Sequence, residues 1–451
     1  MSESSNGESL DGTAARIVAV GLLPGLTVDR LTWRGIWAAT VLGAVWRIAL
    51  LSTKWSQGLL FNDSLYYSFQ AAQNARGQWF RMVFTNGPGA EHPPLVSLVM
   101  TPASLLGNFV FWQRATNTVI GIVLIPLIAL LALRVGGRRA AVVAALVAAA
   151  YPNLWMNDVL VMSESVSALL VVLVLLLAWR LRQRFELGTA AAAGACIGLA
   201  ALSRSELLLL APLIALVGCR SQALLQWAKR AAIVLGVAGA VVGPWMAYNL
   251  SRFDAPVLLS TNEGSVLLGS NCDETYGGPV LGGWLSGCLR DTVVLAGEDA
   301  SELSRRRRDL ALRYVRGHLE GVPLVVVGRL LRTADLYGID DLILLDAGDQ
   351  RPRWASWSGI VGWWALAPMA ALGWWRRRRI AGSFILLVPV ISVVVTAALF
   401  YGAHRLRSPM EPVVVVCAAL GLVGTRFGAR LVDRVLDRML DIVLDIVLAR
   451  G

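Results

Sequence analysis

Residues 62–95 read NDSLYYSFQAAQNARGQWFRMVFTNGPGAEHPPL and directly follow the first long apolar run of the chain. They place an acid, Asp63, and then an acid and an imidazole, Glu91 and His92, beside what we expect to be a membrane surface. Ionisable side chains at a bilayer are costly unless they are paired or used. The spacing of these groups therefore predicts a polar site at the edge of a membrane.

The composition is that of a membrane protein. Of 451 residues, 56% are hydrophobic and only 16% are charged, against about 25% charged residues in an average soluble domain. The net charge of +11 is the excess expected from cytoplasmic Lys and Arg. No nucleic-acid-binding motif accompanies this charge, so no nucleic-acid partner is expected. A cleavable signal peptide is not expected either, because the first 28 residues are polar or only briefly apolar.

Basic clusters at the ends of apolar runs predict the topology, because Lys and Arg concentrate in cytoplasmic loops. The result is an all-α polytopic membrane protein with about ten transmembrane helices and both termini inside. The expected spans are 33–53, 113–134, 140–155, 160–180, 188–203, 206–219, 231–250, 356–375, 380–400 and 409–425. The run 93–111 contains Pro102 and Gly107 and would invert every later loop. We expect it to be a juxtamembrane helix at the outer interface.

This topology divides the chain into regions. They are a cytoplasmic tail (1–32), a membrane module (33–250) with a first outer loop (54–112), a large extracytoplasmic loop (251–355), C-terminal membrane helices (356–425) and a cytoplasmic amphipathic helix (426–451). The large loop is expected to form a small outer subdomain. Its basic run Arg305–Arg308 predicts either a solvated helix face or a contact with membrane lipid headgroups.

Five cysteines are too few for a disulfide scaffold. Cys272 and Cys288 both lie in the large outer loop, where an oxidising compartment permits a bridge. We predict a disulfide between them. Two free thiols remain the alternative, and a metal pair is disfavoured because no His lies between the two cysteines.

The order of the motifs resembles that of type C glycosyltransferases, most closely the branch that holds protein O-mannosyltransferases and the lipid A aminoarabinose transferase. The shared pattern is an Asp in the first outer loop, a Tyr shortly after it, an Ala-rich helix that ends in Gly, and a His-Pro-Pro sequence. In this chain it corresponds to Asp63, Tyr66 with Tyr67, residues 68–77, and residues 92–94. The resemblance covers roughly residues 33–250. It implies an enzyme of the cytoplasmic membrane whose active site faces outward.

The resemblance also implies an inverting transfer of a sugar from a polyprenyl-phosphate donor to a lipid, protein or polysaccharide acceptor. Asp63 would be the general base, although Asp-Ser before an Ala/Gln run is also good helix-capping sequence. Tyr66 and Tyr67 would shape the sugar pocket. Glu91 would face the active site and His92 the donor phosphate, unless residues 91–94 form only a structural turn.

Further residues at predicted outer ends complete the expected site. Asp158 and Glu164 are predicted to be catalytic acids, with snorkelling or helix capping as the alternative. Arg204 is a predicted phosphate ligand, unless it only pairs with Glu206 or Glu164.

The sequence HRLRSPMEP at residues 404–412 resembles an Arg-x-Arg motif of the family. It predicts Arg405 and Arg407 as phosphate ligands, because guanidinium forks fit phosphate oxygens. His404 is expected in the substrate pocket.

No metal or other cofactor is predicted. Asp63 is followed by Ser64 rather than by the acid of a metal-binding pattern, although a divalent metal is not ruled out. Two rival functions remain, a transporter or flippase of lipid-linked sugars and an O-antigen-ligase-like enzyme with a diphosphate donor. A transporter should show repeat symmetry and charged groups near mid-membrane, whereas here the ionisable groups cluster at one predicted face.

Overall fold

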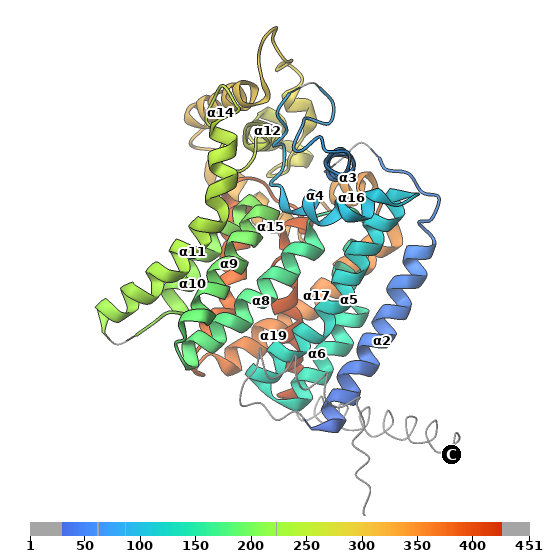
Figure 1. Cartoon of the computed structure of the whole chain (residues 1–451), viewed down its shortest axis with the longest axis vertical. Coiled ribbons are helices and arrows are strands. Elements are labelled where there is room, and N and C mark those ends of the chain that lie inside the picture. Colours follow the sequence, from blue (N-terminus) through green and yellow to red (C-terminus); the bar gives the residue numbers. More distant parts are fainter. Residues whose placement is uncertain (1–28, 61–62, 86, 222, 426–451) are drawn as a thin grey trace, which may run out of the picture.

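The computed structural model describes residues 29–425 except 61–62, 86 and 222, and the regular elements of this part are helical (Figure 1). Long helices run side by side as one bundle, and other helices, among them α3, α12 and α14, gather at one end of it. We call this end the outer end, after the predicted topology, and the opposite end the basic end. The amphipathic helix expected at 426–451 lies outside the described residues.

The bounds of the elements follow the chain order. The helices up to the large loop are α2 (Arg30–Ser52), α3 (Asp63–Ala75), α4 (Leu95–Met100), η1 (Pro102–Leu105), α5 (Phe109–Gly136), α6 (Arg138–Ala150), α7 (Pro152–Asp158), α8 (Glu164–Gln183), α9 (Leu187–Ser203), η2 (Ser205–Leu209), α10 (Leu210–Val217) and α11 (Leu224–Leu250). The later ones are α12 (Glu263–Gly269), α13 (Asp273–Tyr276), η3 (Gly278–Val280), η4 (Ser286–Leu289), α14 (Ala300–Gly317), α15 (Val322–Thr333), α16 (Ile339–Gly348), α17 (Arg353–Arg377), η5 (Ser383–Leu387), α18 (Val388–Leu399), η6 (His404–Arg407) and α19 (Glu411–Val423).

Among the described residues, four helices are long and apolar enough to cross a membrane, or five if the bent pair α6–α7 is one span. The four are α2, α5, α8 and α11. Further apolar helices are shorter than 18 residues, and they correspond to predicted spans at 188–203, 206–219, 380–400 and 409–425. The all-helical membrane fold is thus confirmed, whereas the number of ten crossings stays a prediction.

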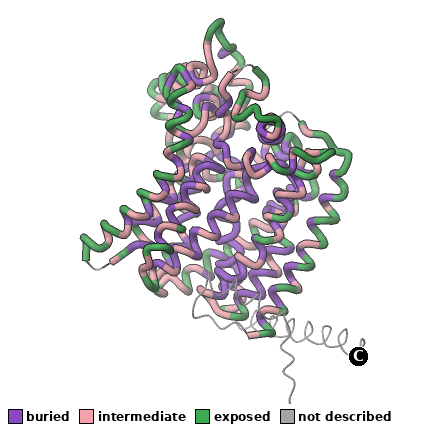
Figure 2. Tube along the Cα trace, in the orientation of Figure 1, coloured by how far each residue is buried: buried purple, intermediate pink, exposed green. Residues whose placement is uncertain are grey.

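Close packing in the bundle depends on small residues. Most of the residues at the centre of the bundle are buried (Figure 2). Between α17 and α19, a Cβ atom at Gly373 would overlap the carbonyl oxygen of Cys417, and one at Gly421 would overlap that of Met369. Glycine therefore permits the two backbones to touch, as is common between helices in membranes.

Two segments differ from what the sequence predicts. Residues 93–111 do not form one juxtamembrane helix, because Pro102 begins a separate short helix, η1, and Asn108 adopts a left-handed conformation before α5. The span expected at 140–155 bends by 54° between α6 and α7. Pro152 is the first residue of α7. It cannot donate a backbone hydrogen bond to the preceding turn, which explains the bend.

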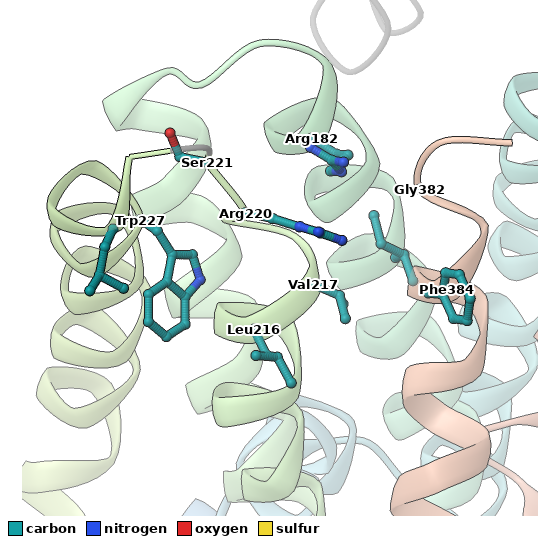
Figure 3. Close-up of a pocket in the computed structure, with 10 residues that line it drawn as sticks. Arg182, Leu216, Val217, Arg220, Ser221, Trp227, Gly382 and Phe384 are labelled. Atoms are coloured by element: carbon teal, nitrogen blue, oxygen red, sulfur yellow. The ribbon is translucent and has the colours of Figure 1, made fainter. Parts of the chain in front are cut away.

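The bundle also has a cavity at its basic end, between the end of α8 and the starts of α11 and η5 (Figure 3). Its volume is about 440 Å³. Arg182 and Arg220 line it together with apolar side chains.

The large loop forms a helical layer over the outer end of the bundle. Its longest helix, α14, begins with a capping box in which Asp299 and Glu302 satisfy each other's backbone N–H groups. Arg306 pairs with Glu298 at 2.7 Å, and Arg307 donates a hydrogen bond to the carbonyl oxygen of Thr292 at 2.9 Å. Half of the basic run is therefore used to fix the segment before α14.

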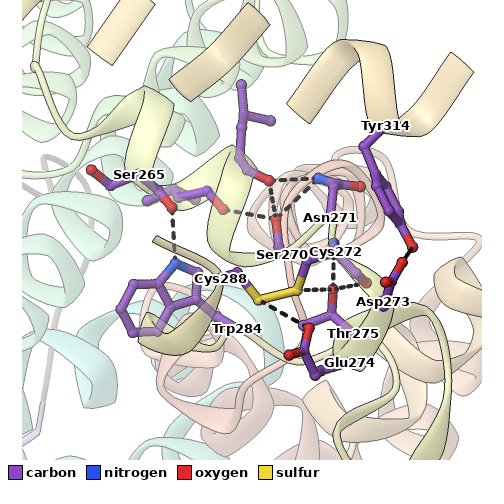
Figure 4. Close-up of a disulfide and its surroundings, with 12 residues drawn as sticks. Ser265, Ser270, Asn271, Cys272, Asp273, Glu274, Thr275, Trp284, Cys288 and Tyr314 are labelled. Atoms are coloured by element: carbon purple, nitrogen blue, oxygen red, sulfur yellow. Dashed lines mark hydrogen bonds between the residues drawn. A yellow bond between two sulfur atoms is a disulfide. The ribbon is translucent and has the colours of Figure 1, made fainter. Parts of the chain in front are cut away.

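Cys272 and Cys288 are joined by a disulfide within this layer (Figure 4). Their Cα atoms are 6.1 Å apart. Cys272 is the N-cap of α13, and Cys288 lies in η4. The bridge therefore ties α13 to η4.

Thiol labelling checks this pairing in the intact membrane protein. In a background in which Cys196, Cys219 and Cys417 are replaced by Ser, an alkylating reagent should modify neither Cys272 nor Cys288 before reduction and both after it. A disulfide blocks the thiolate that the reagent attacks. Peptide mass mapping that finds both cysteines alkylated without a reductant would refute the bridge.

Candidate functional site

A cavity of about 690 Å³ lies at the outer end of the bundle. Distant parts of the chain reach it. They are the start of α3, the turn before α4, the residue before α8, the end of α9 with η2, the loop 255–262 with α12, α14, and the segment from the end of α18 to η6. The polar and charged residues that line it are Asp63, Tyr67, His92, Ser163, Ser203, Arg204, Ser205, Glu206, Ser260, Asn262, Glu263, Ser301, Ser304, Arg305, Arg308, Thr396, Tyr401 and Arg405. The cavity also has an apolar part, which includes Val257, Leu258 and Phe400.

Asp63 faces this cavity and is held by two cations. Its side chain is 32% exposed, and Arg405 Nη2 lies 2.6 Å from its Oδ2 atom. His92 Nε2 lies 3.5 Å from Oδ1. Burial raises the pKa of Asp63, but Arg405 and His92 lower it more, so the pKa is held well below its usual value. Asp63 is therefore an anion at neutral pH.

His92 is fixed between Asp63 and aromatic rings. Its ring centroid lies 4.8 Å from that of Tyr67 and 5.2 Å from that of Tyr66. Burial lowers the pKa of His92, but the neighbouring Asp63 outweighs burial and raises it above the usual value. The pair of His92 and Asp63 thus favours a protonated imidazole beside a carboxylate.

Arg204 and Arg405 meet at a shared carboxylate, Glu164. Glu164 Oε1 lies 3.4 Å from Arg405 Nε and 3.5 Å from Arg204 Nη1, and the Glu164 side chain is fully buried. Arg204 also pairs with Glu206 at 2.6 Å. Glu164 is not among the residues that line the cavity. The structure thus shows Glu164 as the carboxylate that contacts both guanidinium groups, and its catalytic role stays a prediction.

The sequence patterns missed two members of this charge cluster, Asp349 and Arg351. Asp349 Oδ2 lies 3.5 Å from Arg405 Nη1, and Arg351 Nη2 lies 3.9 Å from Glu164 Oε1. Burial raises the pKa of Asp349 above its usual value despite Arg405 and Arg351 nearby. Both residues sit just before α17. Acids and Arg at the end of a predicted span are the signal that could have identified them.

Glu91 and Tyr66 support the cavity wall but do not line it. The Tyr66 hydroxyl donates to Gln70 Oε1 at 2.6 Å and accepts from the Glu91 backbone N–H at 3.1 Å. The Glu91 carbonyl accepts a hydrogen bond from the Ser260 hydroxyl. Burial raises the pKa of Glu91. These two residues were predicted in the site, and the structure places them behind His92, where they fix its turn.

Asp158 lies elsewhere. Its Oδ2 atom is 2.7 Å from Arg47 Nε, both side chains are almost fully buried, and Ser165 donates to its Oδ1 atom at 2.6 Å. A Cβ atom at Gly121 would overlap the Asp158 carboxyl group, so glycine makes room for it. The structure thus places Asp158 apart from the cavity, as the ion-pair partner of Arg47, and its catalytic role stays a prediction.

His404 and Arg407 also face away from the cavity. His404 Nδ1 lies 3.0 Å from Asp335 and Nε2 lies 2.9 Å from Asp346. Arg407 is 1% exposed and pairs with Asp335 at 2.7 Å and with Glu411 at 3.1 Å. Both residues connect η6 to the segments around α15, α16 and α19. The structure therefore does not bring His404 and Arg407 into the cavity, and their roles in the substrate pocket and in phosphate binding stay predictions.

Arg305 and Arg308 line the cavity on the α14 side. Their side chains are 51% and 37% exposed, and their acidic neighbours are weakly placed, at 3.7 Å for Glu302 and 3.9 Å for Asp309. The basic run Arg305–Arg308 thus has two kinds of member. Arg306 and Arg307 bind residues of the large loop, and Arg305 and Arg308 line the cavity.

Both the sequence and the fold are similar to those of known proteins. Residues 91–248, less than half of the chain, match the family described as dolichyl-phosphate-mannose-protein mannosyltransferase. A search of curated proteins finds no match. The matched residues include His92 and Arg204 but not Asp63 or Arg405.

The fold is similar to that of the archaeal oligosaccharyltransferase AglB from Archaeoglobus fulgidus. The structure of AglB with an inhibitory peptide and a dolichol-phosphate superposes with a TM-score of 0.51 at 17% identity, over 91% of this chain and 52% of AglB. The same enzyme with zinc and sulfate superposes with a TM-score of 0.50 at 18% identity, over 91% of this chain and 51% of that one. The chain thus spans about half the length of AglB.

ArnT from Cupriavidus metallidurans bound to undecaprenyl phosphate gives a TM-score of 0.38 at 15% identity, over 84% of this chain and 77% of ArnT. This similarity is too weak to support a common fold by itself. The family match and the AglB likeness agree with the resemblance that the sequence motifs carry, and together they indicate the type C glycosyltransferase fold.

Proposed function

We propose that this chain is a membrane glycosyltransferase that moves a sugar from a polyprenyl-phosphate donor to an acceptor at the outer face of the cytoplasmic membrane. One observation carries the proposal. A carboxylate, Asp63, and two arginines, Arg204 and Arg405, come from distant segments and line one cavity that also has an apolar wall. A base, a phosphate clamp and an apolar surface are what such a transfer requires.

The donor phosphate is assigned to Arg405 and Arg204. A sugar linked through one phosphate carries one negative charge there, and the polyprenyl phosphate that leaves carries up to two. Guanidinium groups that are already oriented stabilise the charge that develops as the bond breaks. Glu164 contacts both arginines and so holds them in place. The clamp consists of protein cations, so the proposal includes no divalent metal.

Asp63 is assigned as the general base of an inverting, single-displacement reaction. The acceptor hydroxyl attacks the anomeric carbon, the bond from this carbon to the phosphate oxygen breaks, and the hydroxyl proton passes to Asp63. As long as Arg405 pairs with Asp63, the carboxylate is a weak base. A donor phosphate that attracts Arg405 would weaken this pair and so raise the basicity of Asp63. Donor binding would thereby prepare the base.

The acceptor is assigned to the side of the cavity that α14 covers. Arg305 and Arg308 line the cavity there and are exposed. The acceptor could be a lipid, a protein or a polysaccharide.

A cleavage assay with defined donors tests the function. The purified chain, reconstituted in lipid, is incubated with polyprenyl-monophosphate sugars or polyprenyl-diphosphate sugars and with cell-envelope extract as acceptor source. We expect release of polyprenyl phosphate, measured by mass spectrometry, from monophosphate donors alone, and the same rate with a metal chelator. Release of polyprenyl diphosphate from diphosphate donors alone would indicate a ligase-like enzyme. Movement of the intact donor across the bilayer without cleavage would indicate a transporter.

A further inference from the structure

The cavity at the basic end has no part in the proposed transfer. It is about 440 Å³ in volume, and Arg182, Arg220, Ser221 and Gly382 line it together with apolar side chains. The apolar members are Leu216, Val217, Leu224, Trp227, Phe384 and Ile385. A cavity that is lined by charged groups and by apolar side chains is typical of a site for an amphipathic molecule.

The helix α8 places this cavity on the other side of the membrane from Asp63. Glu164, which contacts Arg405, is the first residue of α8, and Arg182 is next to its last residue. The helix has 20 residues, which corresponds to about 30 Å, the thickness of a hydrocarbon core. The cavity therefore lies at the surface of the opposite leaflet.

Arg182 and Arg220 approach the same space from two different segments, beside Gly382 and Phe384 (Figure 3). Within the part of the chain that the structure describes, neither guanidinium group has an ion pair or hydrogen bond with a protein group. Two like charges that face one cavity repel each other unless an anion lies between them. The charge complement that this arrangement calls for is an anion, and the oxygens of a phosphate group match two guanidinium forks.

The apolar wall is firmly built. The Trp227 indole N–H donates to the Ala215 carbonyl oxygen at 2.9 Å, which fixes the ring against the end of α10. Gly382 has a φ of +97°, a conformation that other residues rarely adopt. This turn leads the chain into η5, which carries Phe384 and Ile385 to the cavity. A free phosphate ion would leave this wall uncovered, whereas an acyl chain would cover it.

We infer that this cavity is a binding site for an anionic phospholipid of the leaflet at the basic end, with its phosphate between Arg182 and Arg220 and an acyl chain along Trp227 and Phe384. Basic pockets between membrane helices bind anionic headgroups in this manner. The site would anchor the ends of α8, α10 and η5 to one another through the lipid. It does not depend on the proposed transferase activity.

Native mass spectrometry of the full-length chain tests this site. The protein in detergent is titrated with phosphatidylglycerol, with phosphatidylcholine as the zwitterionic control. The double variant Arg182→Gln/Arg220→Gln should lose affinity for phosphatidylglycerol by about 25-fold, or roughly fivefold per arginine. The matched variant Arg184→Gln/Arg379→Gln removes two charges from the same surface outside the cavity. It should stay within about twofold of the parent, because exposed charges farther away are screened.

Three outcomes would overturn the inference. One is equal loss of phosphatidylglycerol binding in both double variants, which would mean diffuse surface charge. The second is equal affinity of the parent for phosphatidylcholine. The third is displacement of the bound lipid by millimolar inorganic phosphate, which would mean that the arginines bind a free anion and that the apolar wall contributes nothing.

Discussion

Asparagine in place of Asp63 is expected to reduce sugar transfer by at least about 100-fold, which is the lower range for loss of a general base. The substitution keeps the size of the side chain, and it removes only the negative charge and basicity. Donor binding should persist, because Arg405 and Arg204 remain. The measurement is single-turnover release of polyprenyl phosphate together with the equilibrium affinity for the donor.

Asp349→Asn is the matched control for this variant. Asp349 also faces Arg405, at 3.5 Å, but does not line the cavity. The control therefore removes a carboxylate from the same guanidinium group without touching the assigned base. Transfer should stay within about tenfold of the parent in Asp349→Asn. Transfer at that level in Asp63→Asn would remove Asp63 from the role of base.

The second large effect is expected from Arg405→Lys. Arg405 reaches Asp63, Glu164 and Asp349 with three different nitrogen atoms. A lysine keeps the charge but has no planar fork, so it cannot hold these carboxylates and a phosphate in one geometry. Donor affinity should fall by about tenfold to 100-fold, which corresponds to the loss of one charge-assisted hydrogen bond. Transfer should fall by at least as much.

The variant Arg407→Lys is the matched control, because it makes the same substitution two residues after Arg405. Arg407 is fully enclosed by Asp335, Glu411 and the Thr333 carbonyl oxygen. Disturbing a buried charge pair lowers the free energy of unfolding, by about 3–5 kcal/mol where one partner is removed outright. We expect a lower melting temperature for Arg407→Lys and an unchanged donor affinity in the folded fraction. Equal loss of donor affinity in both variants would contradict the separate roles of the two arginines.

The contrast of Arg405 with Arg407 shows where the sequence motif stops being informative. Both belong to the same Arg-x-Arg pattern, and both fit a phosphate by chemistry alone. They lie in the short helix η6, where about three residues make a turn. Residues two apart therefore point in different directions, and only the fold determines that Arg405 faces the cavity.

The position of Asp158 apart from the cavity could not be predicted for a related reason. The sequence shows an acid near the expected end of a membrane helix, which is where functional acids lie. Its partner, Arg47, comes 111 residues earlier, within what the sequence predicts as an ordinary span. No spacing rule connects two such positions, because the contact arises from how α2 packs beside the bend of α7. The space that Gly121 provides for the carboxylate is equally hidden in the sequence.

The predictions that agree with the structure rest on physical constraints that act locally. Apolar runs of membrane length must be helical, since a lipid core offers the backbone no hydrogen bonds. This constraint explains why α2, α5, α8 and α11 match expected spans within a few residues, apart from the longer starts of α5 and α11. The positions of the basic loops in the sequence are enough to predict one common, outer side for Asp63, His92, Arg204 and Arg405. The pairing of Asp63 with Arg405 across 342 residues needed the structure.

A structure of the full chain with a bound polyprenyl-phosphate sugar, or a non-cleavable analogue, would decide the assignment of the cavity. We predict a phosphate within hydrogen-bonding distance of Arg405 and Arg204, the prenyl chain along the apolar wall near Val257 and Phe400, and the anomeric carbon facing Asp63. A donor phosphate held away from both arginines, or a sugar separated from Asp63 by the protein, would contradict the proposed mechanism.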